Sequence, residues 1–226
     1  MKRRLEIEMI PPIRSLMQQE MNLDVISEEF SAGYGIADLV GASLSKKNCQ
    51  RRERLGLSTP LDNHHILEIL LLLTTRGRTS ISFLLGRISF SESTLRRKVL
   101  PQMITLGLIK RDLDGRIYLV NEPPEPARYI VAVEAKQTRW RDAILQARRY
   151  TFFANCTYIA VWNGTAELVD RQLLYRHRLG LIGVEPDGAE IILEAPSRKP
   201  RKPKMHRYCA EFLYGKILSS EFLPNS

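Results

Sequence analysis

Hydrophobic and polar positions divide the chain into segments of two periodicities, which predict helices and strands. Near the N-terminus, Pro11-Pro12 opens a predicted helix with one apolar face. Polarity then alternates over 24–31, and an apolar run covers 36–40 with a single acid, Asp38, inside it. Because a strand alternates with a period of two, these two runs predict neighbouring strands.

The second half of the chain repeats this mixture of periods. The run 129–136 is almost wholly apolar, as expected of a central strand that is covered on both faces. The segments that follow predict further elements: a helix at 141–150, a strand at 157–162, a helix at 167–177, strands at 179–184 and 190–193, and a last helix at 208–218. A basic, proline-rich tract at 197–207 precedes that last helix. Its composition fits an arm that binds along the phosphate backbone and a linker equally well. The predicted fold is α/β, a mixed sheet flanked by helices.

Two polar segments separate the middle of the chain from the rest. The run 45–54 is dense in Lys, Arg, Asn and Gln, and we interpret it as a flexible basic linker. The proline-rich run 121–126 is a second linker. Between them lies a segment of about sixty residues, long enough to form a domain of its own.

The inserted segment has the pattern helix, helix, helix, hairpin. Asp62 caps the first predicted helix, Thr79 or Ser80 the second, and Ser91 or Ser93 the third, which Gly107 ends. Two short alternating runs then flank the turn Asp112-Leu113-Asp114-Gly115, as in a β-hairpin.

This arrangement, which ends in TLRRKVLPQMITLGLIKR and DGRIYLV, resembles the winged helix-turn-helix of many bacterial regulators. The resemblance implies that the third helix enters the major groove of DNA while the hairpin lies against phosphates. Five basic residues are the candidate DNA contacts: Arg96, Arg97, Lys98, Arg111 and Arg116. Pro101 departs from an ideal recognition helix because it lacks a backbone donor. The alternative is that these charges solvate an exposed face and that the domain docks another protein.

Composition narrows the choice of partner and compartment. The 226 residues carry a formal charge of +9, which favours nucleic acid or an anionic membrane as a partner. The longest apolar stretch, Ile66–Leu73, is far shorter than the roughly 20 residues that cross a bilayer, and the charged N-terminal region lacks a signal-peptide core. Three widely spaced cysteines suit reduced thiols. We therefore expect a cytoplasmic protein without a membrane partner.

The residues with candidate chemistry lie outside the insertion. Residues two apart in a strand share a face, so Glu134 and Lys136 project together. A Glu-x-Lys pattern also arises in any solvent-facing strand, but this strand is apolar and its charged end needs a partner or a metal. Asp38 ends an equally apolar run. Two carboxylates from neighbouring strand ends make the oxygen site that Mg²⁺ accepts.

Three motifs in succession, GYGIADLV, IVAVEAK and RDAILQARRY, resemble the core of the PD-(D/E)XK nuclease superfamily. The usual proline before the first acid is replaced by Ala37. The resemblance implies that Asp38 and Glu134 bind a divalent metal, Mg²⁺ or Mn²⁺, together with the Ala135 carbonyl. It also implies that Lys136 positions or activates the attacking water.

The same resemblance extends to three further residues. The N-terminal EIEMIPPIRSLM is similar to the family's first helix, and Glu8, preferred over Glu6, is the acid that completes the metal shell. Gln146 and Tyr150 match the Q-x-x-x-Y motif of a subset of these nucleases, and at i and i+4 they share one helical face. Without the resemblance, a helix packed on the sheet explains this spacing equally well.

The sequence therefore predicts a restriction-endonuclease-like domain in two parts, 1–59 and 123–226, interrupted by a winged-helix domain at 60–122. The expected function is metal-dependent hydrolysis of DNA, with the winged helix recruiting or orienting the duplex. The alternative is a DNA-binding regulator or adaptor on a scaffold that does not cut. An RNA substrate and a homodimer remain open at this point.

Overall fold

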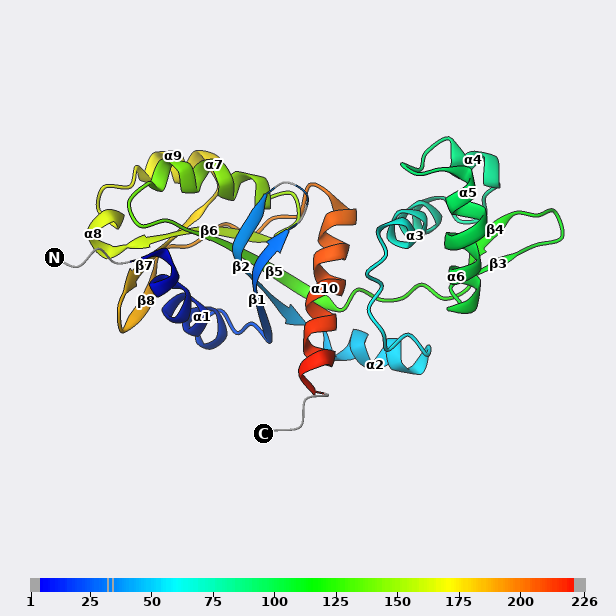
Figure 1. Cartoon of the computed structure of the whole chain (residues 1–226), viewed down its shortest axis with the longest axis horizontal. Helices are drawn as coiled ribbons and strands as arrows, with labels where there is room; N and C mark the ends of the chain where they lie inside the picture. Colours follow the sequence, from blue (N-terminus) through cyan, green and yellow to red (C-terminus); the bar gives the residue numbers. More distant parts are fainter. Residues whose placement is uncertain (1–4, 32, 34, 222–226) are drawn as a thin grey trace. The chain divides into compact units, whose positions relative to one another are not determined.

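The structure is a computed structural model that describes residues 5–31, 33 and 35–221. The chain forms two compact units, and the second, Ser45–Pro126, interrupts the sequence of the first (Figure 1). The first unit consists of the chain up to Leu44 and from Ala127 onward. Two residues between the first two predicted strands, Ala32 and Tyr34, lie outside the described residues.

The first unit is an α/β structure built on a six-stranded mixed sheet. Its strands, in the order in which they neighbour one another, are β1 (Val25–Ser31), β2 (Ile36–Leu44), β5 (Ala127–Ala135), β6 (Cys156–Trp162), β7 (Gly180–Glu185) and β8 (Gly188–Leu193). The three central strands β5, β6 and β7 are parallel, and the remaining pairs are antiparallel. The predicted mixed sheet is confirmed, and its central strands are the apolar runs of the sequence.

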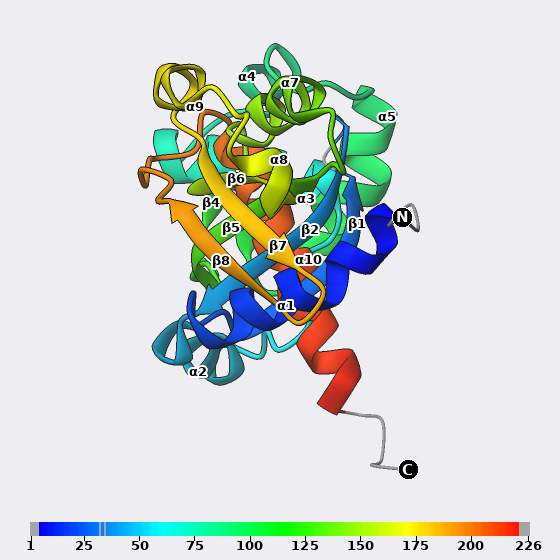
Figure 2. The same cartoon turned by 90° about the vertical axis from the view of Figure 1, so that its left-hand side faces the viewer.

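Helices cover both faces of this sheet. They are α1 (Ile10–Gln19), α7 (Trp140–Tyr150), α8 (Asn163–Ala166), α9 (Arg171–His177) and α10 (Pro203–Glu221), with the 3-10 turn η1 (Glu6–Met9) before α1. One core joins the sheet to α7 and α10, and the other joins it to α1. Figure 2 shows α1 running beside β7 and β8. The predicted flanking helices are confirmed.

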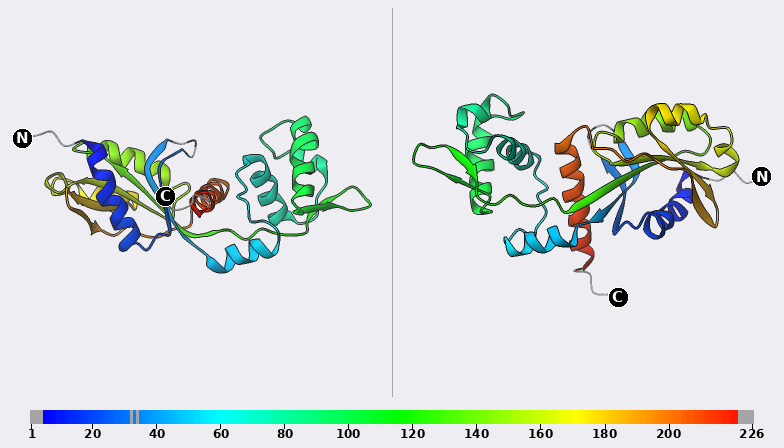
Figure 3. Two further views of the ribbon diagram at one scale, coloured as in Figure 1. Left: turned by 60° about the horizontal axis from the view of Figure 1, so that its bottom comes forward. Right: turned by 180° about the vertical axis from the view of Figure 1, so that it is seen from behind.

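The second unit consists of helices followed by a two-stranded hairpin. Its elements are α2 (Lys46–Arg54), α3 (His64–Arg76), α4 (Ile81–Leu85), α5 (Glu92–Thr94), η2 (Leu95–Val99), α6 (Leu100–Thr105), β3 (Ile109–Arg111) and β4 (Ile117–Leu119). Antiparallel β3 and β4 form a hairpin that projects beyond the helices of this unit (Figure 3). Ser80 caps α4 and Ser91 caps α5, and each was one of the two cap residues predicted for its helix.

Pro101 is accommodated by a local change of helix type. The third predicted helix is continuous from α5 through α6, but its middle turn η2 is a π-helix, in which the Leu100 amide donates to the Leu95 carbonyl. A π-turn shifts the hydrogen-bond pattern by one residue, which suits a position next to an amide that cannot donate. The proline therefore falls within the first turn of α6, where prolines are tolerated.

The expected linker at 45–54 is wrong, because these residues form helix α2. Its Arg52 side chain is fully buried and donates to the carbonyls of Leu57, Thr59 and Pro124 at 3.3, 3.1 and 3.2 Å. A buried guanidinium is stable only when it is hydrogen-bonded, and these three acceptors engage each of its three nitrogens. The Pro124 contact lies 72 residues away in sequence, so local composition could not reveal it.

Three helix starts differ from the sequence predictions. Asn63 caps α3 in place of Asp62, and its side chain accepts from the amides of His65 and Ile66. The helix expected from residue 167 begins at Arg171, after the Asp170 cap. The last helix begins at Pro203, inside the tract that was expected to be irregular.

No helix within the described ranges is long and apolar enough to cross a membrane.

Close packing of β7 against β6 yields a test of the fold. A Cβ atom at Gly180 would lie 2.3 Å from Cδ1 of Tyr158 and 2.8 Å from the Ala195 nitrogen. We expect Gly180→Ala to lower the free energy of unfolding by about 1–3 kcal/mol, because the buried ring must move. Urea denaturation measures this. Gly164→Ala is the control, since a Cβ there meets no described atom within 4 Å, and a loss as large as that of Gly180→Ala would contradict the account.

Candidate active site

The pairing of β2 with β5 brings Asp38 next to Glu134. Leu39 lies opposite Val133 in this antiparallel pair. Asp38 and Glu134, the next residues along the two strands, therefore lie opposite each other. Asp38 Oδ2 accepts a hydrogen bond of 2.7 Å from the Ala135 amide. Two carboxyl groups therefore meet near the ends of β2 and β5.

Both carboxyl oxygens of Glu134 are engaged within the protein. Its side chain is 1% exposed, and Oε1 lies 2.9 Å from Nζ of Lys136. The Tyr150 hydroxyl is in hydrogen-bond contact with Oε2 and also lies 2.6 Å from the Ile36 carbonyl oxygen. Glu134 is thus held from one side by an ammonium on its own chain segment and from the other by a phenol on α7.

Lys136 lies among oxygen atoms directly after β5. Its amide donates to the Ala160 carbonyl at 3.0 Å, which extends the pairing with β6 by one residue. Its Nζ is 3.1 Å from the Ala135 carbonyl oxygen and 3.7 Å from Oε2 of Glu6. Together with Glu134, three oxygen-bearing groups therefore surround the buried ammonium.

Burial raises the pKa of both carboxyl groups above their usual range. At Asp38, desolvation outweighs the Ala135 hydrogen bond and the attraction of Lys136. At Glu134, desolvation again dominates, opposed by hydrogen bonds from Lys136 and Tyr150. Burial alone would lower the pKa of Lys136, but its hydrogen bond to Glu134 and the nearby carboxylates raise it. The pKa of Tyr150 is also raised, by burial and by Glu134, so its hydroxyl stays protonated.

The chemistry of the donor set fits a small divalent cation that keeps several water ligands. No cluster of three or more His, Cys, Asp and Glu side chains suited to a metal occurs among the described residues. Mg²⁺ is commonly held by only one or two carboxylates together with water, which Asp38 and Glu134 provide. The Lys136 ammonium already occupies a cationic position against Glu134 and the Ala135 carbonyl. A bound metal would share these oxygens with Lys136 or replace it.

The N-terminal acid next to this cluster is Glu6 rather than Glu8. Glu6 lies in η1 with Oε2 3.7 Å from Nζ of Lys136. The Glu8 carboxylate accepts instead from the Leu5 amide at 2.9 Å. The sequence preference for Glu8 relied on its nearness to the helix start. The 3-10 turn that precedes α1 sets the direction of these side chains, and composition did not reveal this turn.

Tyr150 and Gln146 differ in their relation to the site. Tyr150 contacts Glu134 directly, a contact that the sequence did not predict. Gln146 lies half-buried one turn earlier on α7, and its side chain makes no hydrogen bond within the described part of the chain. Its amide therefore stays available for a ligand.

The candidate DNA contacts all belong to the second unit. Arg96 is in an ion pair with Glu92 at 2.6 Å, four residues earlier on the same helix. Arg97 and Lys98 are exposed on η2, whereas Arg111 and Arg116 are exposed on the hairpin. Three of these cations thus lie along the third helix and two on the hairpin.

The raised pKa of Asp38 predicts how the stability of the metal-free protein depends on pH. The folded protein binds this proton more tightly than the unfolded chain, so the free energy of unfolding falls as pH rises from the usual value of 3.8 through the raised pKa. Asp38→Asn removes this loss and keeps an acceptor for the Ala135 amide. We expect the variant to melt higher at pH 7 in EDTA, by roughly 2–4 °C for each kcal/mol relieved, and the difference to vanish near pH 3.

Asp187→Asn is the control, because it removes the charge of an exposed carboxylate rather than a buried one. Thermal melts across this pH range, followed by circular dichroism, measure both variants. A lower melting temperature for Asp38→Asn than for the wild type at neutral pH would contradict the assignment of desolvation as the dominant effect.

Comparison with known proteins leaves the family of this chain open. No protein-family model matches the chain, and no curated protein matches it. A solved structure described as SPO1766, a protein of unknown function from Silicibacter pomeroyi, aligns with a TM-score of 0.31 and 21% sequence identity. The alignment covers 41% of this chain and 60% of that one.

Proposed function

We propose that the protein is a divalent-metal-dependent deoxyribonuclease of the PD-(D/E)XK type, in which the second unit is a winged helix that recruits or orients DNA. The observation that carries the proposal is the meeting of Asp38, Glu134 and Lys136 at the end of the β2–β5 pair. In this view the first unit has the restriction-endonuclease-like fold. The protein acts in the cytoplasm, on DNA rather than on a membrane.

Each residue of the cluster has a role in this reaction. Asp38, Glu134 and the Ala135 carbonyl hold the cation, with Glu6 or Glu8 as an outer acid. When bound, Mg²⁺ or Mn²⁺ offsets the negative charge that develops on the phosphate and lowers the pKa of water. Lys136 orients the attacking water. Tyr150 fixes the Glu134 carboxyl through its hydroxyl, and Gln146, one helical turn away, is placed to contact water or phosphate.

A second candidate function is DNA binding without cleavage. The engagement of both Glu134 oxygens by Lys136 and Tyr150 favours it, because these contacts compete with a metal. Incubation of the full chain with supercoiled, linear, single-stranded and branched DNA, in Mg²⁺, Mn²⁺ or EDTA, separates the two. Metal-dependent cleavage supports the nuclease, whereas binding without cleavage in either metal supports the alternative.

The proposed metal ligands predict a linked loss of metal binding and cleavage. We expect Asp38→Ala and Glu134→Gln each to weaken Mn²⁺ binding at least tenfold and to lower the cleavage rate by at least about 100-fold. DNA binding should persist or tighten, since a carboxylate that repels phosphate is removed. Calorimetric titration of Mn²⁺ and a cleavage assay measure the two effects. Asp187→Ala is the matched control on an exposed turn, and unchanged Mn²⁺ affinity in both site variants would sink the assignment.

The proposed recognition helix predicts a change in the salt dependence of DNA affinity. Replacement of Arg96, Arg97 and Lys98 by Ala removes up to about three phosphate contacts, so the negative slope of log affinity against log salt should become shallower by roughly 0.9 for each contact. Turnover at saturating DNA should stay within about twofold, while the half-saturating DNA concentration rises.

A triple variant of exposed α2 cations, Lys46, Lys47 and Arg54 to Ala, is the control for lost charge in the same unit. Fluorescence anisotropy over a salt series and initial cleavage rates provide the measurements. Equal slopes and equal half-saturation in the helix variant and the wild type would show that this helix does not contact DNA.

A further inference from the structure

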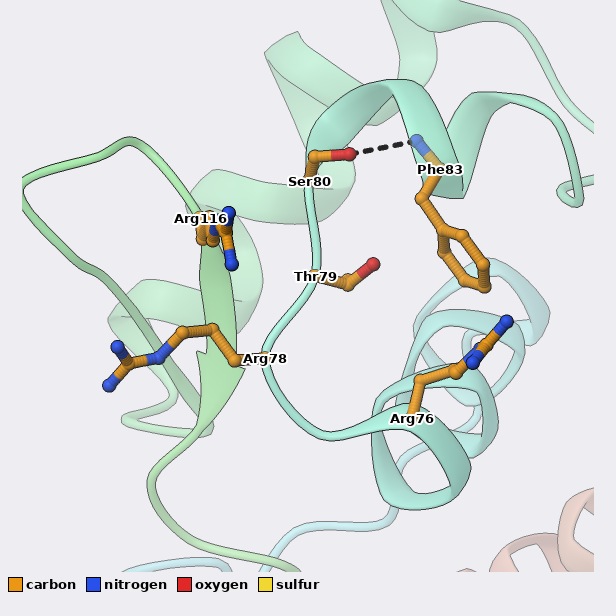
Figure 4. A pocket seen from close by; sticks show the side chains of 6 residues that line it. All are labelled: Arg76, Arg78, Thr79, Ser80, Phe83 and Arg116. Carbon is orange, nitrogen blue, oxygen red and sulfur yellow. Dashed lines mark hydrogen bonds between the residues drawn. The ribbon is translucent and has the colours of Figure 1, made fainter.

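The second unit contains a basic pocket in which Arg116, a candidate DNA contact, meets residues that have no role in the proposed function so far. It has a volume of about 380 Å³ and is lined by Arg76, Arg78, Thr79, Ser80, Phe83 and Arg116 (Figure 4). These residues come from the end of α3, the connection to α4, the start of α4 and the hairpin. Three guanidinium-bearing side chains therefore line one small volume.

Pairing between the α3–α4 connection and the hairpin builds the pocket. The Thr79 amide donates to the Ile117 carbonyl at 2.9 Å, and the Ile117 amide donates to the Thr79 carbonyl at 2.7 Å. This two-bond bridge fixes Arg78 and Arg116, the neighbours of the bridged residues, on adjacent backbone segments. The cations thus gather through backbone hydrogen bonds rather than through a shared acidic partner.

The charges of the pocket are only partly balanced from within. Arg78 lies 3.4 Å from Asp112 and is also stacked against Tyr118. Arg76 and Arg116 make no ion pair with any residue that the structure describes. Asp112 is thus the acid that faces this group of arginines, and a positive excess remains.

A hydroxyl group of the pocket wall also has no partner within the described part of the protein. Thr79 is 7% exposed, and its hydroxyl makes no hydrogen bond with the described residues. Because this hydroxyl has no partner within the protein and lines the same pocket as the arginines, it can donate to a polar ligand there. A hydroxyl donor next to guanidinium groups is a usual combination for phosphate.

The ring in the pocket argues against a site for a free nucleotide. Arg87 and Arg76 both lie over the Phe83 ring, at 3.9 and 5.1 Å from its centroid. A nucleobase would have to displace these cations to stack on the ring. A phosphate from a polymer backbone needs no such stacking surface.

We propose that this pocket binds one phosphate of a nucleic-acid backbone, held by Arg76, Arg116 and the Thr79 hydroxyl. The proposal rests on the DNA-binding part of the proposed function and adds a contact separate from the third helix. The hairpin then contributes Arg116 to a built pocket rather than as an isolated surface charge. DNA is anchored at the α3–α4 connection as well as at Arg97 and Lys98.

Salt-dependent binding of labelled duplex DNA to the full chain in EDTA tests the inference. We expect the double variant Arg76→Gln with Arg116→Gln to make the negative slope of log affinity against log salt shallower by about 0.9, the value for one phosphate. Thr79→Val keeps the side-chain shape, and it should weaken binding roughly tenfold at low salt. Lys47→Gln with Arg54→Gln removes two exposed charges of the same unit and should leave the slope unchanged.

The outcomes separate this inference from the nuclease assignment. A double variant whose slope equals that of the Lys47 and Arg54 control overturns the pocket, even if the wild type cleaves DNA. A reduced slope in a protein that never cleaves keeps the pocket and removes the nuclease. Adenosine monophosphate that displaces DNA far more effectively than inorganic phosphate, at equal ionic strength, would identify a nucleotide site and overturn the backbone assignment. Circular dichroism melts confirm that every variant is folded.

Discussion

The antiparallel pairing of β2 with β5 is the constraint on which the rest of the first unit depends. The chain leaves the sheet after Leu44 and returns at Ala127. The loop that this strand pair closes in the sequence is therefore the whole second unit. A long excursion raises the entropic cost of closure only slowly with its length, and a ladder between central strands offsets it. The register is decisive, because a slip by one residue would turn Asp38 and Glu134 to opposite faces.

The same pairing buries charged groups of the site, which lowers the stability of the fold. Strands covered on both faces must bury apolar groups, yet Glu134 and Lys136 are buried at the end of β5. Their ion pair and the Tyr150 hydroxyl satisfy the polar atoms, but desolvation still raises the pKa of both acids. Such charged groups in an apolar setting are typical of functional sites, where stability is given up for chemistry.

Local sequence patterns predicted the strands that hold the site, because a short apolar run that carries a single acid is typical of a buried strand. They did not reveal contacts between distant segments. Composition suggested a linker at 45–54, whereas the buried Arg52 and its distant acceptors make it a helix. The choice between Glu6 and Glu8 depended on a 3-10 turn, and the Tyr150 contact depended on how α7 packs on the sheet. Nothing in the sequence marked Thr79 and Arg76 as pocket residues, since their pocket exists only once the hairpin pairs with the α3–α4 connection.

The most direct test of the proposed metal site is anomalous diffraction from crystals of the wild-type protein soaked with Mn²⁺. The account predicts a manganese peak within about 2 Å of carboxyl oxygens from both Asp38 and Glu134. It also predicts that Lys136 Nζ shifts from its present 2.9 Å contact with Glu134. A saturating soak that leaves this position without a peak, with Lys136 still paired to Glu134, would contradict the central claim.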